Sequence, residues 1–268
     1  MQAFNYAKPS SVGDAARAAG GADAKLLAGG QSLLAAMKLG LAAPAALVDL
    51  GGVAELKGIT VSGGTVKIGA MTTHAAVAAS KDVQQAIPAL AALAGGIGDR
   101  QVRNCGTIGG SLANNDPAAD YPAAALGLGA TIHTDKRTIA ADDFFKGLYQ
   151  TALNDGEIIT AVSFPVPEKA GWQKFKQPAS RFALVGVFVA DFGTGGKDAV
   201  RVAVTGAGPC AFRQSDMEKA LSQKFAPESV AGIKVKPDGL NNDLHASPEY
   251  RAHLITVMAK RAVEAALK

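Results

Sequence analysis

The sequence predicts an α+β protein built from two domains. The chain has 268 residues, which is longer than a typical single domain. Segments with helical spacing and short strand-like runs follow one another along it, so both kinds of element are expected. After Pro167 the pattern changes to three strand candidates followed by helices. A boundary near residues 165–172 follows, with a larger domain over residues 1–168 and a smaller one over residues 169–268.

The first 55 residues predict helices and strands in alternation. A hydroxyl side chain at Ser10 or Ser11 can cap the first helix, and Gly20 can end it. The predicted elements are a helix to Ala19, a strand at 25–28, a helix at 33–39 and a strand at 47–50.

The pattern over residues 56–168 predicts a hairpin, several helices and three further strands. The hairpin turns at Ser62-Gly63-Gly64, and Pro165 stops the last strand because proline cannot donate a ladder hydrogen bond. The predicted strands are 59–61, 65–69, 130–134, 137–140 and 157–164, and the predicted helices are 73–79, 83–94 and one from Pro122.

The smaller domain predicts a three-stranded sheet and helices. Ser247-Pro248-Glu249 is a typical helix start, because it offers a cap, a proline at the first position and an early acid. The predicted strands are 172–176, 183–192 and 200–206, and the predicted helices are 216–224 and 248–267.

Composition excludes several classes of protein. With 48% hydrophobic and 19% charged residues the chain is expected to fold. A net charge of +4 without a Lys/Arg run argues against nucleic-acid binding. Two cysteines cannot hold an iron–sulfur cluster, and the isolated histidines predict no metal site. No apolar stretch spans a membrane and no signal peptide is evident, so we expect a cytoplasmic protein, unless partners attach it to a membrane or carry it through an export route.

Two glycine-rich loops far apart in the sequence are the most informative feature. One is Gly29-Gly30-Gln31-Ser32 and the other is Gly106-Thr107-Ile108-Gly109-Gly110-Ser111. Glycines let an anion approach successive backbone N–H groups, so the two loops together predict a clamp for a diphosphate. Each loop can also be an ordinary turn. Neither GxGxxG nor GxxxxGK[ST] occurs, which argues against a Rossmann domain and a P-loop.

The longest distinctive block runs from Arg100 through Asn104-Cys105-Gly106-Thr107 to Asn114-Asn115-Asp116-Pro117 and Asp120. Together with the first glycine loop, residues 4–9, 68–73, 156–160 and 247–251, it resembles a known family over essentially the whole chain. The chain is similar to the medium, FAD-binding subunit of the molybdenum hydroxylases. This group contains xanthine dehydrogenase, aldehyde oxidoreductase and aerobic carbon monoxide dehydrogenase.

The resemblance implies a fold and a cofactor site. The fold would be a two-lobed FAD-binding domain of the vanillyl-alcohol-oxidase or PCMH type, with α+β lobes at about 1–55 and 56–168, followed by the family's C-terminal domain. The FAD diphosphate and ribityl chain would lie on Leu26, Leu27, Ala28, Gly29, Gly30, Gln31, Ser32, Leu33, Thr107, Ile108, Gly109, Gly110 and Ser111. Ile97 and Ile159 would contact the cofactor, Asp120 would bond to its hydroxyls, and Lys176 would lie near the flavin ring.

Each single residue has a simpler alternative. Asp120 can cap the helix that starts at Pro122, Lys176 can be a solvated strand residue, and Ile97 can be apolar core. Two departures matter. Gln31 replaces a histidine of many members, so FAD is expected to be non-covalent. Many members also have an acid after the arginine that matches Arg181, where this chain is apolar.

The implied function is electron transfer within an oxidoreductase complex, with no catalytic acid or base in this chain. A large partner would hold the molybdenum cofactor, and a small partner with 2Fe–2S clusters would pass electrons to FAD. The external acceptor would be a quinone, NAD or O2, and the assembly a dimer of heterotrimers. Two alternatives stay open: a stand-alone flavoenzyme similar to the enolpyruvyl-sugar reductases, and a flavin-free scaffold subunit.

Overall fold

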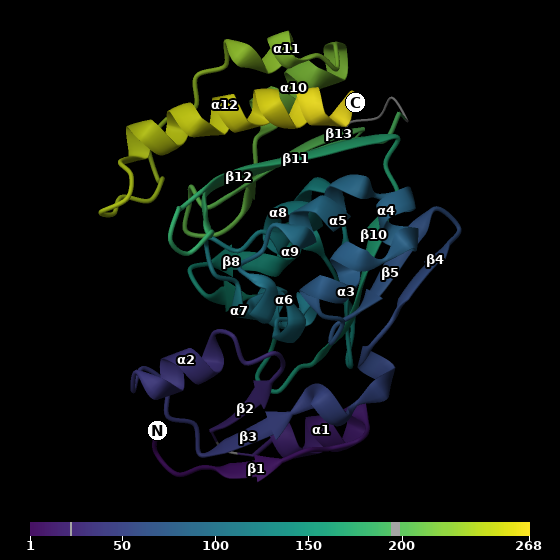
Figure 1. Cartoon of the computed structure of the whole chain (residues 1–268), viewed down its shortest axis with the longest axis vertical. Coiled ribbons are helices and arrows are strands. Elements are labelled where there is room, and N and C mark those ends of the chain that lie inside the picture. The colour runs from purple at the N-terminus through teal and green to yellow at the C-terminus, as the bar shows by residue number, and fades with distance from the viewer. Residues whose placement is uncertain (22, 194–198) are drawn as a thin grey trace.

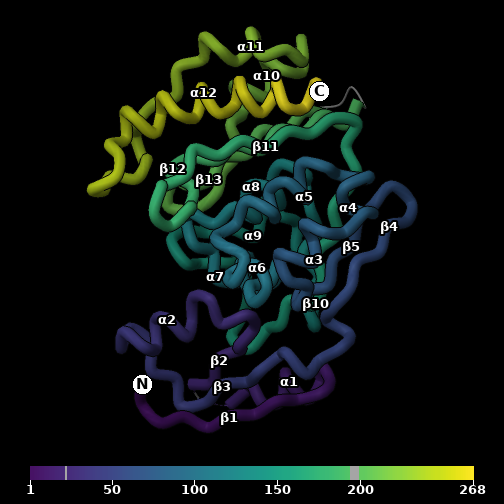
Figure 2. The backbone as a smooth tube through the Cα atoms, viewed as in Figure 1, coloured from purple at the N-terminus to yellow at the C-terminus, as the bar shows by residue number. Residues whose placement is uncertain are grey.

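The computed structural model describes residues 1–21, 23–193 and 199–268. The chain forms three stacked parts along its longest axis (Figure 1). The N-terminal residues lie at one end, a group of helices with a five-stranded sheet lies in the middle, and the C-terminal sheet and helices form the other end. The backbone trace places the two chain termini in the two outer parts (Figure 2).

The N-terminal part is a small parallel sheet with the strand order β1-β3-β2. Its elements are β1 (Asn5–Ala7), α1 (Val12–Ala19), β2 (Ala24–Leu27), α2 (Leu33–Lys38) and β3 (Ala46–Asp49), followed by two 3-10 turns at Leu50–Gly52 and Ala54–Leu56. Ser11 caps α1, because its hydroxyl accepts a hydrogen bond from the Asp14 N–H. The edge strand β1 was not predicted, since all three of its residues are exposed and no apolar pattern marks it.

The middle part contains an antiparallel sheet with the order β4-β5-β10-β6-β7. Its strands are β4 (Ile59–Ser62), β5 (Thr65–Gly69), β6 (Thr131–Thr134), β7 (Thr138–Ala140) and β10 (Ile159–Pro165). A short helix and a two-stranded ribbon lie between β7 and β10: α9 (Ala141–Phe144), β8 (Phe145–Gly147) and β9 (Gln150–Thr151). The predicted hairpin at Ser62 is present, and its strands pair from Ile59 opposite Ile68 to Ser62 opposite Thr65.

Six helices accompany this sheet in the middle part: α3 (His74–Ala79), α4 (Lys81–Ala86), α5 (Pro88–Gly95), α6 (Arg100–Cys105), α7 (Ile108–Asn114) and α8 (Tyr121–Gly127). The single helix predicted over 83–94 is two helices, because Pro88 removes a backbone donor and starts a new helix. Helices α6 and α7 were not predicted, since their glycine and polar content resembles a loop. Asp99 and Thr107 start them by accepting hydrogen bonds from the Val102 and Gly110 N–H groups.

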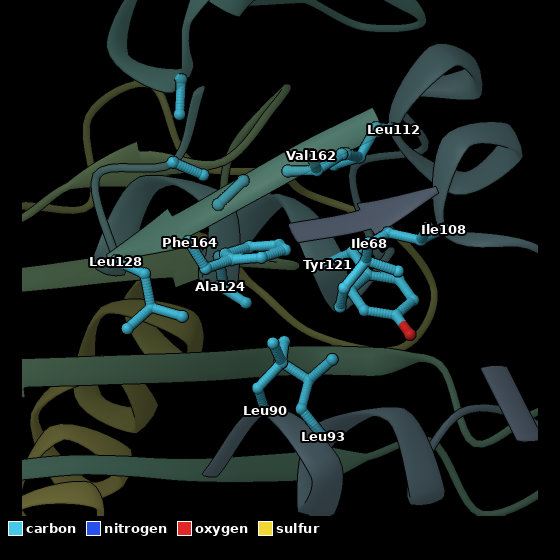
Figure 3. Close-up of a cluster of buried hydrophobic side chains, with 14 of the residues drawn as sticks. Ile68, Leu90, Leu93, Ile108, Leu112, Tyr121, Ala124, Leu128, Val162 and Phe164 are labelled. Carbon is cyan, nitrogen blue, oxygen red and sulfur yellow. The ribbon is translucent and has the colours of Figure 1, made fainter. Parts of the chain in front are cut away.

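The core of the middle part joins the sheet to these helices. Ile68, Leu90, Tyr121 and Phe164 are fully buried and belong to one hydrophobic cluster (Figure 3). Burial of side chains of this size contributes about 1.5–3 kcal/mol each. This cluster therefore holds α5, α7 and α8 on the sheet and fixes the helix starts that face the N-terminal part.

The C-terminal part corrects one prediction, because its sheet has four strands rather than three. The order is β11-β12-β13-β14, with β11 (Lys169–Lys176), β12 (Ala183–Asp191), β13 (Val200–Thr205) and β14 (Phe212–Arg213). The fourth strand has only two residues, too short for a recognisable alternation. The helices are α10 (Ser215–Gln223), α11 (Pro227–Ala231) and α12 (Pro248–Ala266).

This sheet is covered on both faces. Every residue of β13 and all but the last of β12 are buried, which explains why both strands are mostly apolar rather than alternating. Helix α12 packs on β11 and β12, and α8 packs on β12 and β13 from the middle part. A Cβ at Gly127 would lie 2.8 Å from the Phe188 ring, so α8 and β12 approach closely.

One hydrophobic cluster consequently crosses the expected domain boundary. Phe188 and Ala203 of the C-terminal sheet belong to the same cluster as Ile68 and Phe164. Residues 166–168 connect β10 to β11 between the two sheets. The division after residue 168 stays a prediction.

Candidate functional site

A cavity of about 1210 Å³ lies between the N-terminal part, the helices of the middle part and the turn after β11. It is lined by most of the residues predicted to hold a cofactor: Leu26, Ala28, Gly29, Gly30, Gln31, Ser32, Leu33, Ile97, Thr107, Gly109, Gly110, Ser111, Asp120 and Ile159. These residues come from distant segments, so the fold brings both glycine loops and the predicted contacts to one place.

The first glycine loop connects β2 to α2 and presents unused donors to the cavity. Gly30 has φ +70°, a left-handed conformation that favours glycine. In the described part of the chain, none of the four backbone N–H groups of residues 29–32 donates a hydrogen bond to another protein group. Unpaired successive N–H groups on a cavity wall are suited to an anion with several oxygens.

The two glycine loops touch each other. A Cβ at Gly29 would lie 2.1 Å from the carbonyl oxygen of Cys105 and 2.7 Å from the Cα of Gly106. A Cβ at Gly110 would lie 3.2 Å from the Cβ of Ala28. Gly29 is therefore required for close packing of the loops, which an ordinary turn would not demand.

The second loop does not offer the same donors, which differs from the expectation that both loops clamp a diphosphate. The Ile108 and Gly109 N–H groups donate to the carbonyl oxygens of Thr72 and Ala70, and the Gly110 N–H donates to the Thr107 hydroxyl. Because this segment begins α7, its backbone is consumed by the helix start and by the neighbouring strand. Its contribution to the cavity is the surface of its glycines and the side chain of Ser111.

Asp120 is a buried carboxylate at the cavity wall. It precedes α8, but its side chain makes no capping hydrogen bond, which is against the simpler interpretation of this residue. Its Oδ2 accepts a 2.6 Å hydrogen bond from Lys174 Nζ, and its Oδ1 has no partner among the described residues. Burial raises the pKa of Asp120 to about 6, although the Lys174 ammonium opposes this rise. A buried carboxylate with a free oxygen is suited to accept a hydrogen bond from a ligand hydroxyl.

The cation of β11 that lines the cavity is Lys174, and the role of Lys176 near the flavin ring stays a prediction. The pairing of β11 with β12 is irregular between Phe175 and Lys176, so regular strand alternation does not continue from Lys174 to Lys176. Lys176 is exposed and lines a second, smaller pocket. The sequence pattern gives no signal for this irregularity.

Two other predicted residues do not line the cavity. Ile108 is fully buried in the hydrophobic cluster under α7, and Leu27 ends β2 beside the lining residues Leu26 and Ala28. Both lie between residues that do line the cavity. Their side chains face away because neighbouring positions on a strand or helix point in different directions.

His74 and Tyr121 form a buried polar pair that sequence reasoning did not identify. Their ring centroids are 5.3 Å apart, and neither His74 Nδ1 nor the Tyr121 hydroxyl has a partner in the residues that the structure describes. His74 also lines the cavity. Burial lowers the pKa of His74 to about 4 and Arg103 adds to this, so the imidazole is neutral at pH 7. A helix-start histidine gives no sequence signal for this environment.

Further lining residues were also missed. They include Asn114, Asp116, Tyr149, Arg181 and Phe182. They belong to helix ends and turns whose position depends on tertiary packing. Within residues 1–21, 23–193 and 199–268, no group of three or more His, Cys, Asp or Glu side chains is arranged to hold a metal ion.

Comparison with known proteins identifies the family of this fold and cavity. A family model described as the FAD binding domain in molybdopterin dehydrogenase matches residues 2–167. The chain belongs to this family. The resemblance inferred from the sequence is therefore confirmed, and the chain is a medium, FAD-binding subunit of the molybdenum hydroxylases, a component of an oxidoreductase.

Curated relatives match this subunit along its whole length. The carbon monoxide dehydrogenase medium chain of Hydrogenophaga pseudoflava is 37% identical over 98% of this chain and 96% of the relative. The nicotine 6-hydroxylase medium subunit of Paenarthrobacter nicotinovorans is 36% identical over 98% of this chain and 97% of the relative.

Solved structures share the fold of this subunit. Carbon monoxide dehydrogenase from Hydrogenophaga pseudoflava superposes with a TM-score of 0.90 at 37% identity, covering 99% of this chain and 98% of that one. Quinoline 2-oxidoreductase from Pseudomonas putida 86 also reaches 0.90, at 30% identity, covering 100% and 98%.

The residues that line the cavity fit the FAD of this family, independently of the comparisons. The free N–H groups of residues 29–32 suit a diphosphate, and the unpaired Oδ1 of Asp120 suits a hydroxyl. Ile97 and Ile159 add apolar surface. Among the described helices, none has the length and apolar character needed to cross a membrane.

Proposed function

We propose that this subunit relays electrons between iron–sulfur clusters of a small partner and an external acceptor, through FAD held in the cavity. The observation that carries the proposal is the joint presence of four unused backbone donors and one half-paired buried carboxylate in the lining of a single cavity. Bound FAD supplies the chemistry, because flavin can take up electrons singly and release them in pairs.

The chain's own groups bind and orient the cofactor. Residues 29–32 would donate to its diphosphate, Asp120 would accept from a hydroxyl, and the side chains of Ile97 and Ile159 would cover apolar ring surface. Lys174 holds the Asp120 carboxylate in place from the C-terminal part. No acid–base step is assigned to any of these side chains, so the rate of the complex would be set by electron delivery and by substrate oxidation elsewhere.

Two partners would complete the enzyme. Relatives of this length are named medium chains or medium subunits, which implies larger and smaller companions. We propose that a large subunit carries the molybdenum cofactor, that a small subunit carries 2Fe–2S clusters, and that the assembly is a dimer of heterotrimers. Quinone, NAD and O2 are the acceptors to compare. Gln31, at the position where many members have a histidine, supports a non-covalent cofactor.

A spectrum of the subunit expressed alone tests the cofactor. We expect flavin absorption bands, and FAD released into the supernatant after acid precipitation at about one per chain. Failure of the flavin-free chain to take up added FAD would reject the stand-alone flavoenzyme. Co-expression with the partners then distinguishes a site completed in the complex from a scaffold without flavin.

A partner test follows from the same preparation. Tagged subunit expressed in its source cells should co-purify with one larger chain that contains molybdenum and one smaller chain that contains iron and sulfide. If the purified subunit oxidises a substrate with no companion chain present, the relay proposal is wrong.

A further inference from the structure

His74 is a buried histidine that lines the FAD cavity where the two glycine loops meet. Its backbone N–H donates to the Gly106 carbonyl oxygen at 2.9 Å, and a Cβ at Gly106 would lie 2.6 Å from His74 Nε2. Gly106 in turn abuts Gly29, whose added Cβ would lie 2.7 Å from the Gly106 Cα. The imidazole is therefore held against the second loop at the point where that loop touches the first one, which carries the unused N–H groups.

The ring nitrogens of His74 are not used by the protein. Nδ1 is buried without a partner, and Nε2 forms no hydrogen bond within residues 1–21, 23–193 and 199–268. The buried hydroxyl of Tyr121, whose ring centroid is 5.3 Å away, also lacks a partner there. Because buried polar groups are normally hydrogen-bonded, an imidazole with two open nitrogens in a cavity lining is suited to a ligand.

The surroundings of His74 keep its imidazole neutral in the flavin-free chain. Burial lowers the pKa of His74 to about 4, and the Arg103 guanidinium of α6 adds to this. Helix α5, which packs on α3, has no charged residue, and Lys81 and Asp82 of α4 are exposed. Tyr121 of α8 keeps its proton, because burial raises the pKa of its hydroxyl. The imidazole is therefore poised to respond to a negative charge that enters the cavity.

We propose that His74 is a further FAD-binding residue whose imidazole takes up a proton from solvent when the diphosphate of the cofactor binds. The inference rests on the FAD site of the proposed function. The Ile108, Gly109 and Gly110 N–H groups of the second loop are already used, so this loop lacks the donors that the first loop offers. An imidazolium N–H at Nε2 supplies a charged donor in their place.

The charge of the diphosphate provides the driving force for this proton uptake. A negative charge within about 4–6 Å favours the charged form of a histidine. The doubly charged diphosphate of FAD therefore raises the pKa of His74 and opposes the effects of burial and of Arg103. No covalent bond changes, and the proton returns to solvent when the cofactor leaves.

The heat of FAD binding to the flavin-free full chain, measured in two buffers that differ in ionisation enthalpy, gives the number of protons taken up. We expect about half a proton or more per FAD at pH 7, decreasing as the pH rises. Asp120 cannot produce this signal, because a carboxylate that accepts a ligand hydroxyl loses a proton. His74→Gln should abolish the uptake. His253→Gln is the matched control and should keep it, because His253 is an exposed histidine of α12 outside the cavity.

The pH dependence of FAD affinity separates proton uptake from a merely structural role of His74. The wild-type Kd should rise between pH 6.5 and 9, whereas the Kd of the His74→Gln variant should stay constant. At pH 6.5 the variant should bind FAD about tenfold more weakly, the effect expected for one lost charged hydrogen bond, and at pH 9 the two proteins should be similar.

Two results would overturn the proposal: FAD binding to the wild-type chain without proton uptake, or a loss of affinity in the His74→Gln variant that is equal at both pH values. Neither measurement involves electron transfer. Failure of the relay in the assembled complex would therefore leave this inference standing, and failure of this inference would leave the relay standing.

Discussion

The contact between the two glycine loops makes Gly29→Ala a sharp test of the cavity. An added methyl carbon would lie 2.1 Å from the Cys105 carbonyl oxygen, whereas unstrained contact needs about 3.5 Å. The loops must therefore separate by about 1.4 Å, and the obstacle is backbone that cannot rotate away. The neighbouring free N–H groups of residues 29–32 move with the loop.

The expected loss of stability and of FAD affinity follows from this overlap. Overpacking costs about 1–3 kcal/mol when side chains can adjust, so we expect about 3 kcal/mol here. For a chain of this size that corresponds to a melting temperature lower by on the order of 6 to 12 °C. Displacing one or two donors of an anion costs about 1.5 kcal/mol or more, which predicts FAD binding at least about tenfold weaker.

Thermal unfolding and FAD titration by flavin fluorescence measure both effects. Gly232→Ala is the matched control, because this glycine follows α11 in a helical conformation with nothing within 4 Å of the added carbon. Its stability should change by less than about 0.5 kcal/mol and its FAD affinity not at all. Wild-type stability and FAD content in the Gly29→Ala variant would refute the loop contact.

Three further predictions concern buried titratable groups. Asp120→Asn leaves the buried Lys174 ammonium without a counter-ion, so FAD should dissociate about tenfold more readily in ultrafiltration, and an unchanged affinity would contradict the role of the carboxylate. Hydrogen bonds, first of all from Arg137, lower the pKa of Glu157 to about 2, so its stabilisation is present above about pH 4.5 and is lost toward pH 2. Glu157→Gln should cost about 2 kcal/mol at pH 7 and little at pH 2 in unfolding experiments, and an equal cost at both would exclude this explanation. The pKa of His74 is about 4 in the fold, whereas the unfolded chain takes up a proton at this side chain below about pH 6.5. The free energy of unfolding should therefore fall by about 1.4 kcal/mol per pH unit from pH 6.5 to 4. His74→Gln should flatten that slope in unfolding experiments on flavin-free protein.

Much of the fold was predictable from local patterns. The hairpin at Ser62, the capped helix after Ser11 and the long final helix after Ser247 all have strong local signals, and all are present. Elements without such signals were missed. Strand β14 has two residues that pair with β13 at the edge of the sheet, and helix α7 begins in a glycine-rich segment that resembles a loop. Their existence depends on tertiary contacts.

At the candidate site too, the sequence predicted segments better than single residues. The glycine loops were identified from their residues and Asp120 by resemblance, and the structure places them at one cavity. The sequence pattern did not single out Lys174, whose place at the cavity depends on the packing of β11 and on an irregular strand pairing after Phe175. Nor could it predict that the carbonyl oxygens of Thr72 and Ala70 use up donors of the second loop, since those pairings join distant segments.

The covered C-terminal sheet has a consequence for anyone who wants to express the FAD-binding part alone. Helix α8 is buried along its whole length, and much of what covers it is β12 and β13. A truncated chain ending at residue 168 would expose this apolar helix to water and would also lack Lys174, the counter-ion of Asp120. Such a fragment would be expected to aggregate. Truncation after residue 168 would therefore divide a hydrophobic core that the middle and C-terminal parts share, so the two parts must be expressed together.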